Sequence, residues 1–296
     1  MRISLFKYLI KGCRATPCEQ LVITKHGPED CRAFTFAEAE EPLNAVTQRR
    51  DPELVFIQPT MLDAGLRIET VPGAPTKMSP ILVSRDAWEA NVCTARQVLI
   101  HKKAYYGVDQ GDEVADWIST YLGRRVRLYY MPNLPDRFRR VPSRVPEGVE
   151  SSVKFADSHS LLLTTYVSLV ELNRQLPPQY EPFSMSNFRP NIVVDSEDEP
   201  TKPEPWIEET WRRFNCGEVV LHGVKLCTRC VVVSTNQQTG ERQDFKLLAA
   251  MTQIHSAESK GKAVPVKGMY LVPGSEGVIH DRDRIGNITF GPRPEL

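Results

Sequence analysis

The sequence predicts a mainly β protein with a few short helices, and three observations support this fold class. Short apolar runs separated by turn residues recur along the chain, as at 21–23 and 33–36, and this spacing is typical of antiparallel strands. Val- and Thr-rich runs such as 231–235 favour strands over helices. Only two segments have clear helical character, so most of the predicted elements are strands.

The first strand is predicted within residues 1–10, which contain a short apolar run, and the other strands are predicted at later apolar segments. These are 21–23, 33–36, 54–57, 81–83, 97–100, 125–130, 160–165, 192–194, 231–235 and 287–290.

A first helix is predicted over 112–122, where Val114, Ala115, Ile118 and Leu122 lie at helical spacing, with a glycine before and after. A second, shorter helix is predicted at 168–173. There a serine is followed three residues later by a glutamate, as in a capping box.

Composition and charge exclude several classes of protein. The 296 residues contain 37 basic and 37 acidic side chains, so the chain lacks the positive charge of nucleic-acid or anionic-membrane binders. No run approaches the ~18–20 apolar residues of a membrane span. The first ten residues do not resemble a signal peptide, since Lys7 interrupts their apolar run. Seven cysteines, an odd number without a dense framework, indicate free thiols in a reducing compartment.

The predicted domain organisation has two parts. Residues 131–152 contain four prolines, several arginines and few large apolar groups, so we interpret them as a linker. It separates a domain over 1–130 from a domain over 153–296. Another segment, at 195–205, is acidic and rich in proline, and it is predicted to be an exposed loop.

The most informative motif is Cys227-Thr228-Arg229-Cys230, directly before the β-branched run. A thiolate suits a soft or high-valent metal, and Arg229 could supply a cation beside it or a fork for phosphate. Three other interpretations stay open: a zinc half-site, a redox pair and two buried structural thiols. Because side chains alternate along a strand, the two cysteines are expected to point to opposite faces.

Other polar segments precede predicted strands. Arg189 lies between two asparagines before 192–194, where an arginine can hold phosphate and an amide can recognise a heterocycle. Asp157, Ser158 and His159 precede 160–165. The simpler interpretation of both segments is an ordinary surface loop. Lys11-Gly12 follows the first strand, where a glycine could admit a ligand close to the backbone, although Lys11 and Arg32 could serve only solubility.

Taken together, these motifs resemble the MOSC family in its two-domain form, which includes amidoxime-reducing components and YcbX-type proteins. The resemblance covers nearly the whole chain. It rests on segments in the family's order: 47–52, 111–123, 155–157, 168–173, 188–191 and 227–230 with 239–240. It implies an N-terminal β-barrel-like domain followed by a MOSC β-barrel domain.

The resemblance also implies roles for individual residues. Cys227 corresponds to the molybdenum ligand and the catalytic residue. The other matched positions correspond to cofactor-binding residues: Lys11, Gly12, Arg32, Asp157, Ser158, His159, Arg189, Asn191, Arg229 and Tyr270. The sequence departs from the family's pattern at Gly12, Cys31, Ser160 and Lys267-Gly268, which bears on the shape of the pocket and the range of substrates.

The function implied is that of a molybdenum-cofactor oxidoreductase that reduces N-hydroxylated or N-oxide substrates. The alternative is a sulfur carrier or cofactor-handling protein that uses a cysteine persulfide. The chain has no Rossmann glycine fingerprint, iron–sulfur spacing or haem motif. Electrons are therefore expected from a partner, either a cytochrome b5-like protein or a flavin or iron–sulfur reductase. Pyridoxal phosphate is not expected, and the location is expected to be cytoplasmic or mitochondrial-associated.

Overall fold

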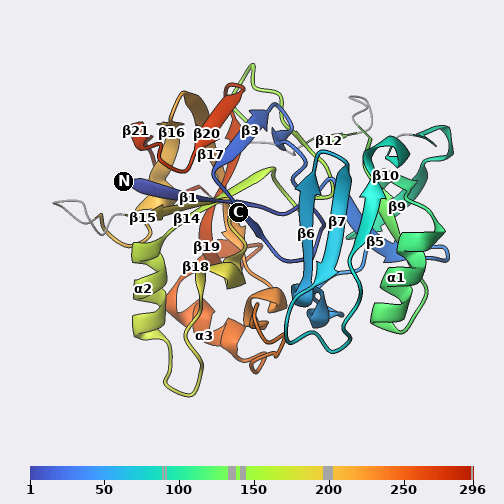
Figure 1. Ribbon diagram of the computed structural model, residues 1–296. Coiled ribbons are helices and arrows are strands. Elements are labelled where there is room, and N and C mark those ends of the chain that lie inside the picture. The colour runs from blue at the N-terminus through green and yellow to red at the C-terminus, as the bar shows by residue number, and fades with distance from the viewer. Residues whose placement is uncertain (89, 91, 133–137, 141–144, 196–202, 295) are drawn as a thin grey trace.

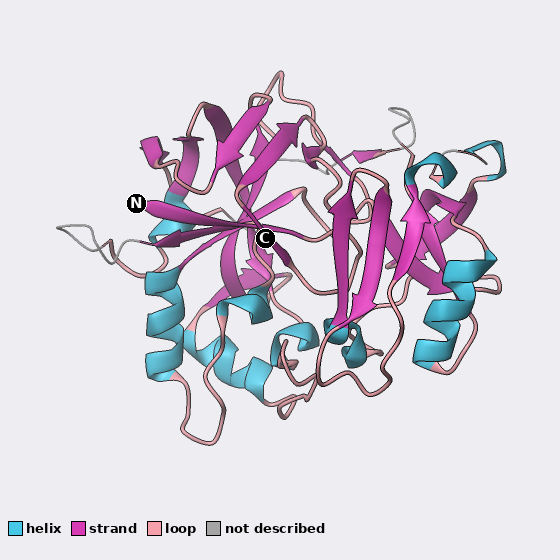
Figure 2. Ribbon diagram, viewed as in Figure 1, coloured by secondary structure: helices cyan, strands magenta, loops and turns pink. Residues whose placement is uncertain are grey.

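The computed structural model describes residues 1–88, 90, 92–132, 138–140, 145–195, 203–294 and 296. Strands predominate, and the described part of the chain contains three α-helices, which lie on the outside of the molecule (Figure 2). The prediction of a mainly β fold is therefore confirmed. Part of the predicted linker and the centre of the predicted 195–205 loop lie outside the described residues.

The largest sheet has nine strands and occupies one side of the molecule (Figure 1). Its strands are antiparallel except that β14 runs parallel to β15. In spatial order they are β2 (Thr16–Cys18), β1 (Arg2–Lys7), β15 (Ile192–Asp195), β14 (Leu161–Thr165), β19 (Lys262–Pro273), β17 (Val219–Thr228), β16 (Trp211–Cys216) and β21 (Ile285–Phe290), with β18 (Ser256–Ser259) also paired to β19.

The other side of the molecule contains two smaller sheets and helix α1 (Asp112–Leu122). One sheet has the order β5 (Phe34–Glu38), β11 (Val126–Tyr130), β10 (Lys103–Asp109) and β9 (Arg96–Ile100). The second has β6 (Ile57–Leu62), β7 (Gly65–Thr70) and β8 (Ile81–Ser84). Apolar side chains of these sheets and of α1 form one buried core.

Short elements join these parts. The remaining strands are β20 (Gly277–His280), β3 (Gln20–Thr24) and β4 (Gly27–Pro28) in one sheet, and β12 (Arg139–Arg140) with β13 (Ser152–Val153) in another. The 3₁₀ helices are η1 (Pro52–Phe56), η2 (Arg85–Ala87), η3 (Val92–Thr94), η5 (Met185–Phe188), η6 (Ile207–Thr210) and η7 (Val231–Ser234).

Both predicted helices are present, but one begins earlier than expected. Helix α1 has the predicted bounds and ends at Gly123 in the left-handed conformation (φ 65°), as a C-terminal glycine allows. Helix α2 (Tyr166–Gln175) is capped by Thr165, whose hydroxyl accepts a hydrogen bond from the Ser168 amide, so Ser168 is not the N-cap. Helix α3 (Leu247–Ile254) was not predicted.

Two predicted strands are wrong. The run at 54–57 belongs mostly to η1, which begins at Pro52, a residue that suits the first turn of a helix. The run at 231–235 is mostly η7, and its Val233 packs into the core beneath α2 and α3. Burial against helices therefore outweighs the β propensity of its valines.

The first strand pairs with the C-terminal half of the chain. β1 lies beside β15, and β3 lies beside β20. Ile3 and Leu5 are buried in the core of the large sheet. The structure thus places these strands with residues that the sequence-based division assigns to the second domain, and the domain boundaries stay a prediction. Within the described residues, no helix is both long and apolar enough to cross a membrane.

Candidate cofactor site

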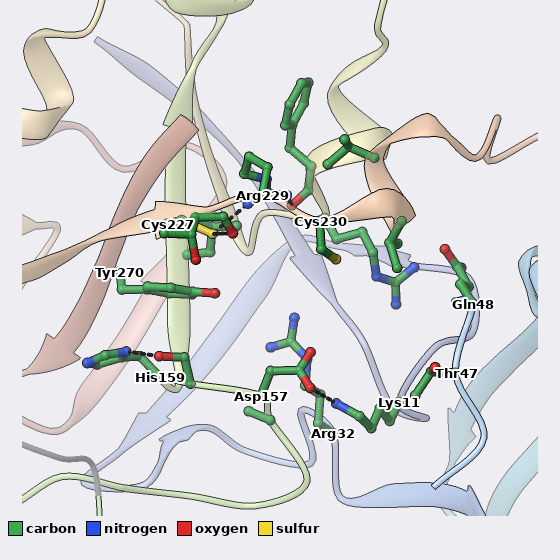
Figure 3. A pocket seen from close by; sticks show the side chains of 18 of the residues that line it. Lys11, Arg32, Thr47, Gln48, Asp157, His159, Cys227, Arg229, Cys230 and Tyr270 are labelled. Atoms are coloured by element: carbon green, nitrogen blue, oxygen red, sulfur yellow. Dashed lines mark hydrogen bonds and ion pairs between the residues drawn. The ribbon is translucent and has the colours of Figure 1, made fainter. Parts of the chain in front are cut away.

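A cavity of about 320 Å³ lies where the two halves of the chain meet. Its volume is in the range of small-ligand pockets. Figure 3 shows side chains from both halves turned toward it. The predicted site residues that line it are Lys11, Gly12, Arg32, Asp157, Ser158, His159, Arg189, Cys227, Arg229 and Tyr270.

Asn191 is the one predicted site residue that does not line this cavity. Its side chain is fully buried, donates to the Phe6 carbonyl at 3.1 Å and to Cys31 Sγ at 3.4 Å, and accepts from the Leu162 amide at 3.2 Å. In this arrangement Asn191 joins β1 to β14. These contacts give it a structural role behind the cavity.

Two arginines enter the cavity from strained backbone positions. Arg32 and Arg189 have φ angles of 53° and 56°, in the left-handed region that side chains disfavour. Their guanidinium carbons lie 5.2 and 4.5 Å from the centre of the Tyr8 ring. Burial lowers the pKa of Arg189 and raises the pKa of Tyr8 to about 12. The face of the Tyr8 ring therefore makes cation–π contacts with both guanidinium groups.

Asp157 is held by two partners on the N-terminal half. Its Oδ1 is 2.7 Å from Lys11 Nζ and 2.8 Å from His101 Nε2. Burial alone would raise the pKa of Asp157, but Lys11 and His101 outweigh burial and hold the pKa well below its ordinary value. Burial lowers the pKa of Lys11, and Asp157 opposes that shift. The ion pair thus connects the two halves across one wall of the cavity.

This shift predicts a pH-dependent stability. Because the folded-state pKa of Asp157 is depressed, its contribution is present above the unfolded pKa of about 3.9 and is lost as pH falls through the folded pKa. We expect Asp157→Asn to lower the melting temperature by about 2 °C at pH 7. The difference from wild type should shrink as the pH falls below about 4.

The measurement is thermal unfolding followed by circular dichroism between pH 7 and pH 3. Asp116→Asn, on the exposed face of α1, is the matched control and should show little change. A difference for Asp157→Asn that stayed constant down to pH 3 would contradict the assignment of the ion pair.

Cys227 lies at the end of β17 and is 2% exposed. Arg229 donates to its Sγ through Nη1 and to the Phe188 carbonyl through Nη2 at 2.7 Å, whereas the buried Nε has no partner among the described residues. Burial and the neighbouring Cys227 raise the pKa of Tyr270 well above its ordinary value. The sulfur is thus enclosed by one cationic and one phenolic side chain (Figure 3).

The expectation that Cys227 and Cys230 face opposite sides is wrong, because both line the cavity. The strand ends at Thr228, and Cys230 is the N-terminal cap of η7. Strand alternation therefore stops between the two cysteines. All seven cysteines are free. The described residues contain no group of three or more His, Cys, Asp or Glu side chains arranged to hold a metal ion.

His159 is a neutral group at physiological pH. Burial, followed by the nearby Lys225 and Arg139, lowers its pKa to about 3. Its ring stacks on Tyr270 with centroids 4.9 Å apart, and its Nδ1 lies 2.7 Å from the Ser158 hydroxyl. Its buried Nε2 has no partner among the described residues. This nitrogen is available to a ligand.

Sequence reasoning missed Gln48, Arg49 and Lys225, which line the cavity, and His101, which contacts it through Asp157. Cys230 also lines it, although the sequence led us to expect that it faces away. Arg49 Nη1 lies 2.8 Å from His101 Nε2, and Arg49 Nη2 is 3.6 Å from Cys230 Sγ. Gln48 and Arg49 lie within a motif that carries the family resemblance, but that pattern gave no sign that they face a ligand. No local sequence pattern indicated that His101 contributes to the site.

The donor set fits an anionic cofactor with a soft or high-valent metal. Six cationic side chains line the cavity against one carboxylate, Asp157. The unpartnered Arg229 Nε and His159 Nε2 can serve further polar atoms of a ligand. Arginine forks match phosphate, and the Cys227 sulfur suits a soft or high-valent metal. The molybdenum cofactor, which combines a phosphate, a pterin and a metal, has these requirements.

Comparison with known proteins gives two family matches. A MOSC N-terminal beta barrel domain matches residues 2–125, and a MOSC domain matches residues 150–286. Mitochondrial amidoxime-reducing component 1 of Homo sapiens is 25% identical over 291 residues, covering 95% of this chain and 81% of the relative. Component 2 of Macaca fascicularis is 27% identical, covering 97% and 80%.

A molybdenum cofactor sulfurase of Drosophila grimshawi is 25% identical over 261 residues, which are 87% of this chain but only 31% of the sulfurase. These relations support a function connected with the molybdenum cofactor. The chain belongs to the MOSC family, with the family's N-terminal beta barrel domain followed by its MOSC domain.

Proposed function

We propose that this protein is a molybdenum-cofactor oxidoreductase that reduces N-hydroxylated or N-oxide substrates with electrons from a partner protein. The observation that carries the proposal is the convergence of Lys11, Arg32, Arg189 and Arg229 around one cavity with the Cys227 sulfur. The similarity to amidoxime-reducing components supports this reaction class.

In this proposal different residues of the cavity bind different parts of the cofactor. Arg189 and Arg32 would hold the phosphate, and Cys227 would ligate the metal. When bound, the cofactor supplies the two-electron chemistry that breaks the N–O bond. For a hydroxylamine the balance is R–NH–OH + 2 electrons + 2 protons → R–NH₂ + H₂O.

The remaining side chains would orient the sulfur and control protons. Arg229 fixes the Cys227 side chain by donating to Sγ while its other amino group is tied to the Phe188 carbonyl. His159 would offer Nε2 as a neutral hydrogen-bonding group, since its low pKa keeps it uncharged. Asp157 stays ionised and holds Lys11 at the opposite wall.

The electron donor would be a cytochrome b5-like protein or a flavin or iron–sulfur reductase. The proposed location is cytoplasmic or mitochondrial-associated, and relatives named as mitochondrial support the second of these. We retain the division into a domain over 1–130, a linker over 131–152 and a domain over 153–296 as part of the proposal.

The test is to purify the protein from a host that makes the cofactor and to measure molybdenum, pterin and amidoxime reduction with an artificial electron donor. We expect about one molybdenum and one pterin per chain, and turnover of benzamidoxime to benzamidine. Protein that contains neither metal nor pterin would contradict the proposal. Bound cofactor without turnover of any N-hydroxylated substrate would contradict its reductase part.

A second candidate function is a sulfur carrier, and Cys230 favours it. This thiol is only partly buried, lines the same cavity and lies 3.6 Å from Arg49 Nη2. The sulfurase relative is consistent with this function. Mass spectrometry of the isolated protein would show a persulfide on Cys230 if sulfur transfer is its role.

A further inference from the structure

A pair of glutamines joins the two halves of the chain directly behind Arg189. Gln48 and Gln237 lie 189 residues apart in the sequence and are 1% and 8% exposed. Gln48 Nε2 donates to Gln237 Oε1 at 3.1 Å, and Gln237 Nε2 donates back to Gln48 Oε1 at 3.0 Å. The two amides therefore form a closed, reciprocal pair.

Each amide also has backbone partners on its own half. Gln48 Nε2 donates to the Gly12 carbonyl at 2.6 Å, and Gln237 Nε2 donates to the Thr235 carbonyl at 3.1 Å. The donors and acceptors of both amides are thus engaged in a buried place, where an unmade hydrogen bond is costly. Because these hydrogen bonds are made on both sides of each amide, they fix the orientation of each amide plane.

The loop that carries Gln237 is docked on the N-terminal half by further contacts. Arg242 donates through Nη2 to the Gln48 carbonyl. A Cβ placed on Gly240 would lie 2.9 Å from Cε2 of the Phe56 ring, so this loop approaches η1 too closely for a larger residue. The amide pair is therefore part of a tight junction between the halves.

This junction contacts the guanidinium of Arg189. Gln237 Oε1 accepts from Arg189 Nη1 at 3.3 Å as well as from Gln48, and Arg189 Nη2 donates to the Cys13 carbonyl at 2.7 Å. Both acceptors approach the terminal amino groups, and the Tyr8 ring lies 4.5 Å from the guanidinium carbon. A planar guanidinium held by two acceptors and a ring has one defined orientation.

We infer that Gln48 and Gln237 are positioning residues: their reciprocal amide pair holds the two halves together at Arg189 and fixes the direction in which its remaining N–H groups meet a phosphate monoester in the cavity. This inference rests on the proposed cofactor function and goes beyond it, because neither glutamine has to touch the cofactor. Cofactor retention then depends on contacts across the junction and not on the arginine alone.

The experiment compares Gln237→Met, Gln48→Met and the double variant with wild type. Methionine keeps the length of the side chain and removes the amide. Gln110→Met is the matched control, since Gln110 is also 8% exposed and donates to two backbone carbonyls, but these belong to Trp88 and Val108 and not to the junction at Arg189. The readouts are the rate of pterin release, followed by fluorescence after oxidation, and the melting temperature of cofactor-free protein.

We expect pterin release to become about tenfold faster in each single variant, which corresponds to about 1.4 kcal/mol. Because the pair is reciprocal, the double variant should release pterin no faster than the worse single variant. The control should release pterin at the wild-type rate at any temperature where it is folded. If Gln237→Met folds poorly, Gln237→Asn replaces it in the experiment. Asparagine keeps the amide but is too short to reach the same partners, so pterin release should again be faster than in wild type.

Release rates equal to those of the control would overturn the inference, even if the glutamine variants melt at lower temperature. Independent, additive effects of the two substitutions would also overturn it. Wild-type protein without pterin would instead refute the proposed function on which the inference rests, so the two failures are distinguishable.

Discussion

Cys227→Ala is expected to abolish amidoxime reduction and to remove the molybdenum. The thiol is 2% exposed, lies in the cavity and is held by Arg229. Loss of partners that only support a metal ligand costs about 10–100-fold in metal affinity or activity, so loss of the ligand itself should cost more than about 100-fold. Pterin content should fall less, because the arginines that would bind the phosphate remain. Molybdenum content and turnover with an artificial donor provide the measurement.

Cys230→Ser is the matched control for this prediction. Both cysteines line the cavity, but the Cys227 sulfur accepts a hydrogen bond from Arg229, whereas the Cys230 sulfur lies 3.6 Å from Arg49 Nη2. We expect Cys230→Ser to keep its molybdenum and most of its activity. Equal loss of metal in both variants would favour a site that the two thiols share, such as zinc. Full reductase activity in Cys227→Ala would show that the reaction does not depend on this thiol.

Arg189→Ala is expected to lower pterin content strongly. A charge-assisted hydrogen bond contributes roughly 1.5–3 kcal/mol, which corresponds to about 10–150-fold in affinity. The substitution also leaves Gln237 Oε1 and the Cys13 carbonyl without their arginine donor. Arg189→Lys should restore part of the affinity, since an ammonium keeps the charge and loses the planar fork.

The measurement is pterin per chain after gel filtration, with the cofactor-free melting temperature recorded in parallel. Arg212→Ala is a suitable control. Arg212 is also partly buried, and burial also lowers its pKa, but its side chain donates to Glu209 and Trp211 carbonyls away from the cavity. Full pterin occupancy in Arg189→Ala would refute the role of Arg189 in phosphate binding.

The sequence by itself determined the fold class and nine of the described strands, but it did not reveal the two longest, β17 and β19. Alternating apolar residues place Ile3 and Leu5 on one face of β1, and the two glycines around 112–122 set both ends of α1. These features depend on nearby residues alone, so a pattern can reveal them. The motifs around Cys227, Arg189 and Asp157 also indicated a common site, because each carries its chemistry in a short segment.

Only the tertiary structure decided how those segments meet. The pairing of β1 with β15 depends on a partner almost two hundred residues away. The run at 231–234 is a 3₁₀ helix whose Val233 is buried against helices, and this conformation brings Cys230 to the same cavity as Cys227. His101 and Gln237 acquire their importance from contacts with Asp157 and Arg189. Such contacts form between segments that local propensity and periodicity treat as unrelated, so no local pattern could have predicted them.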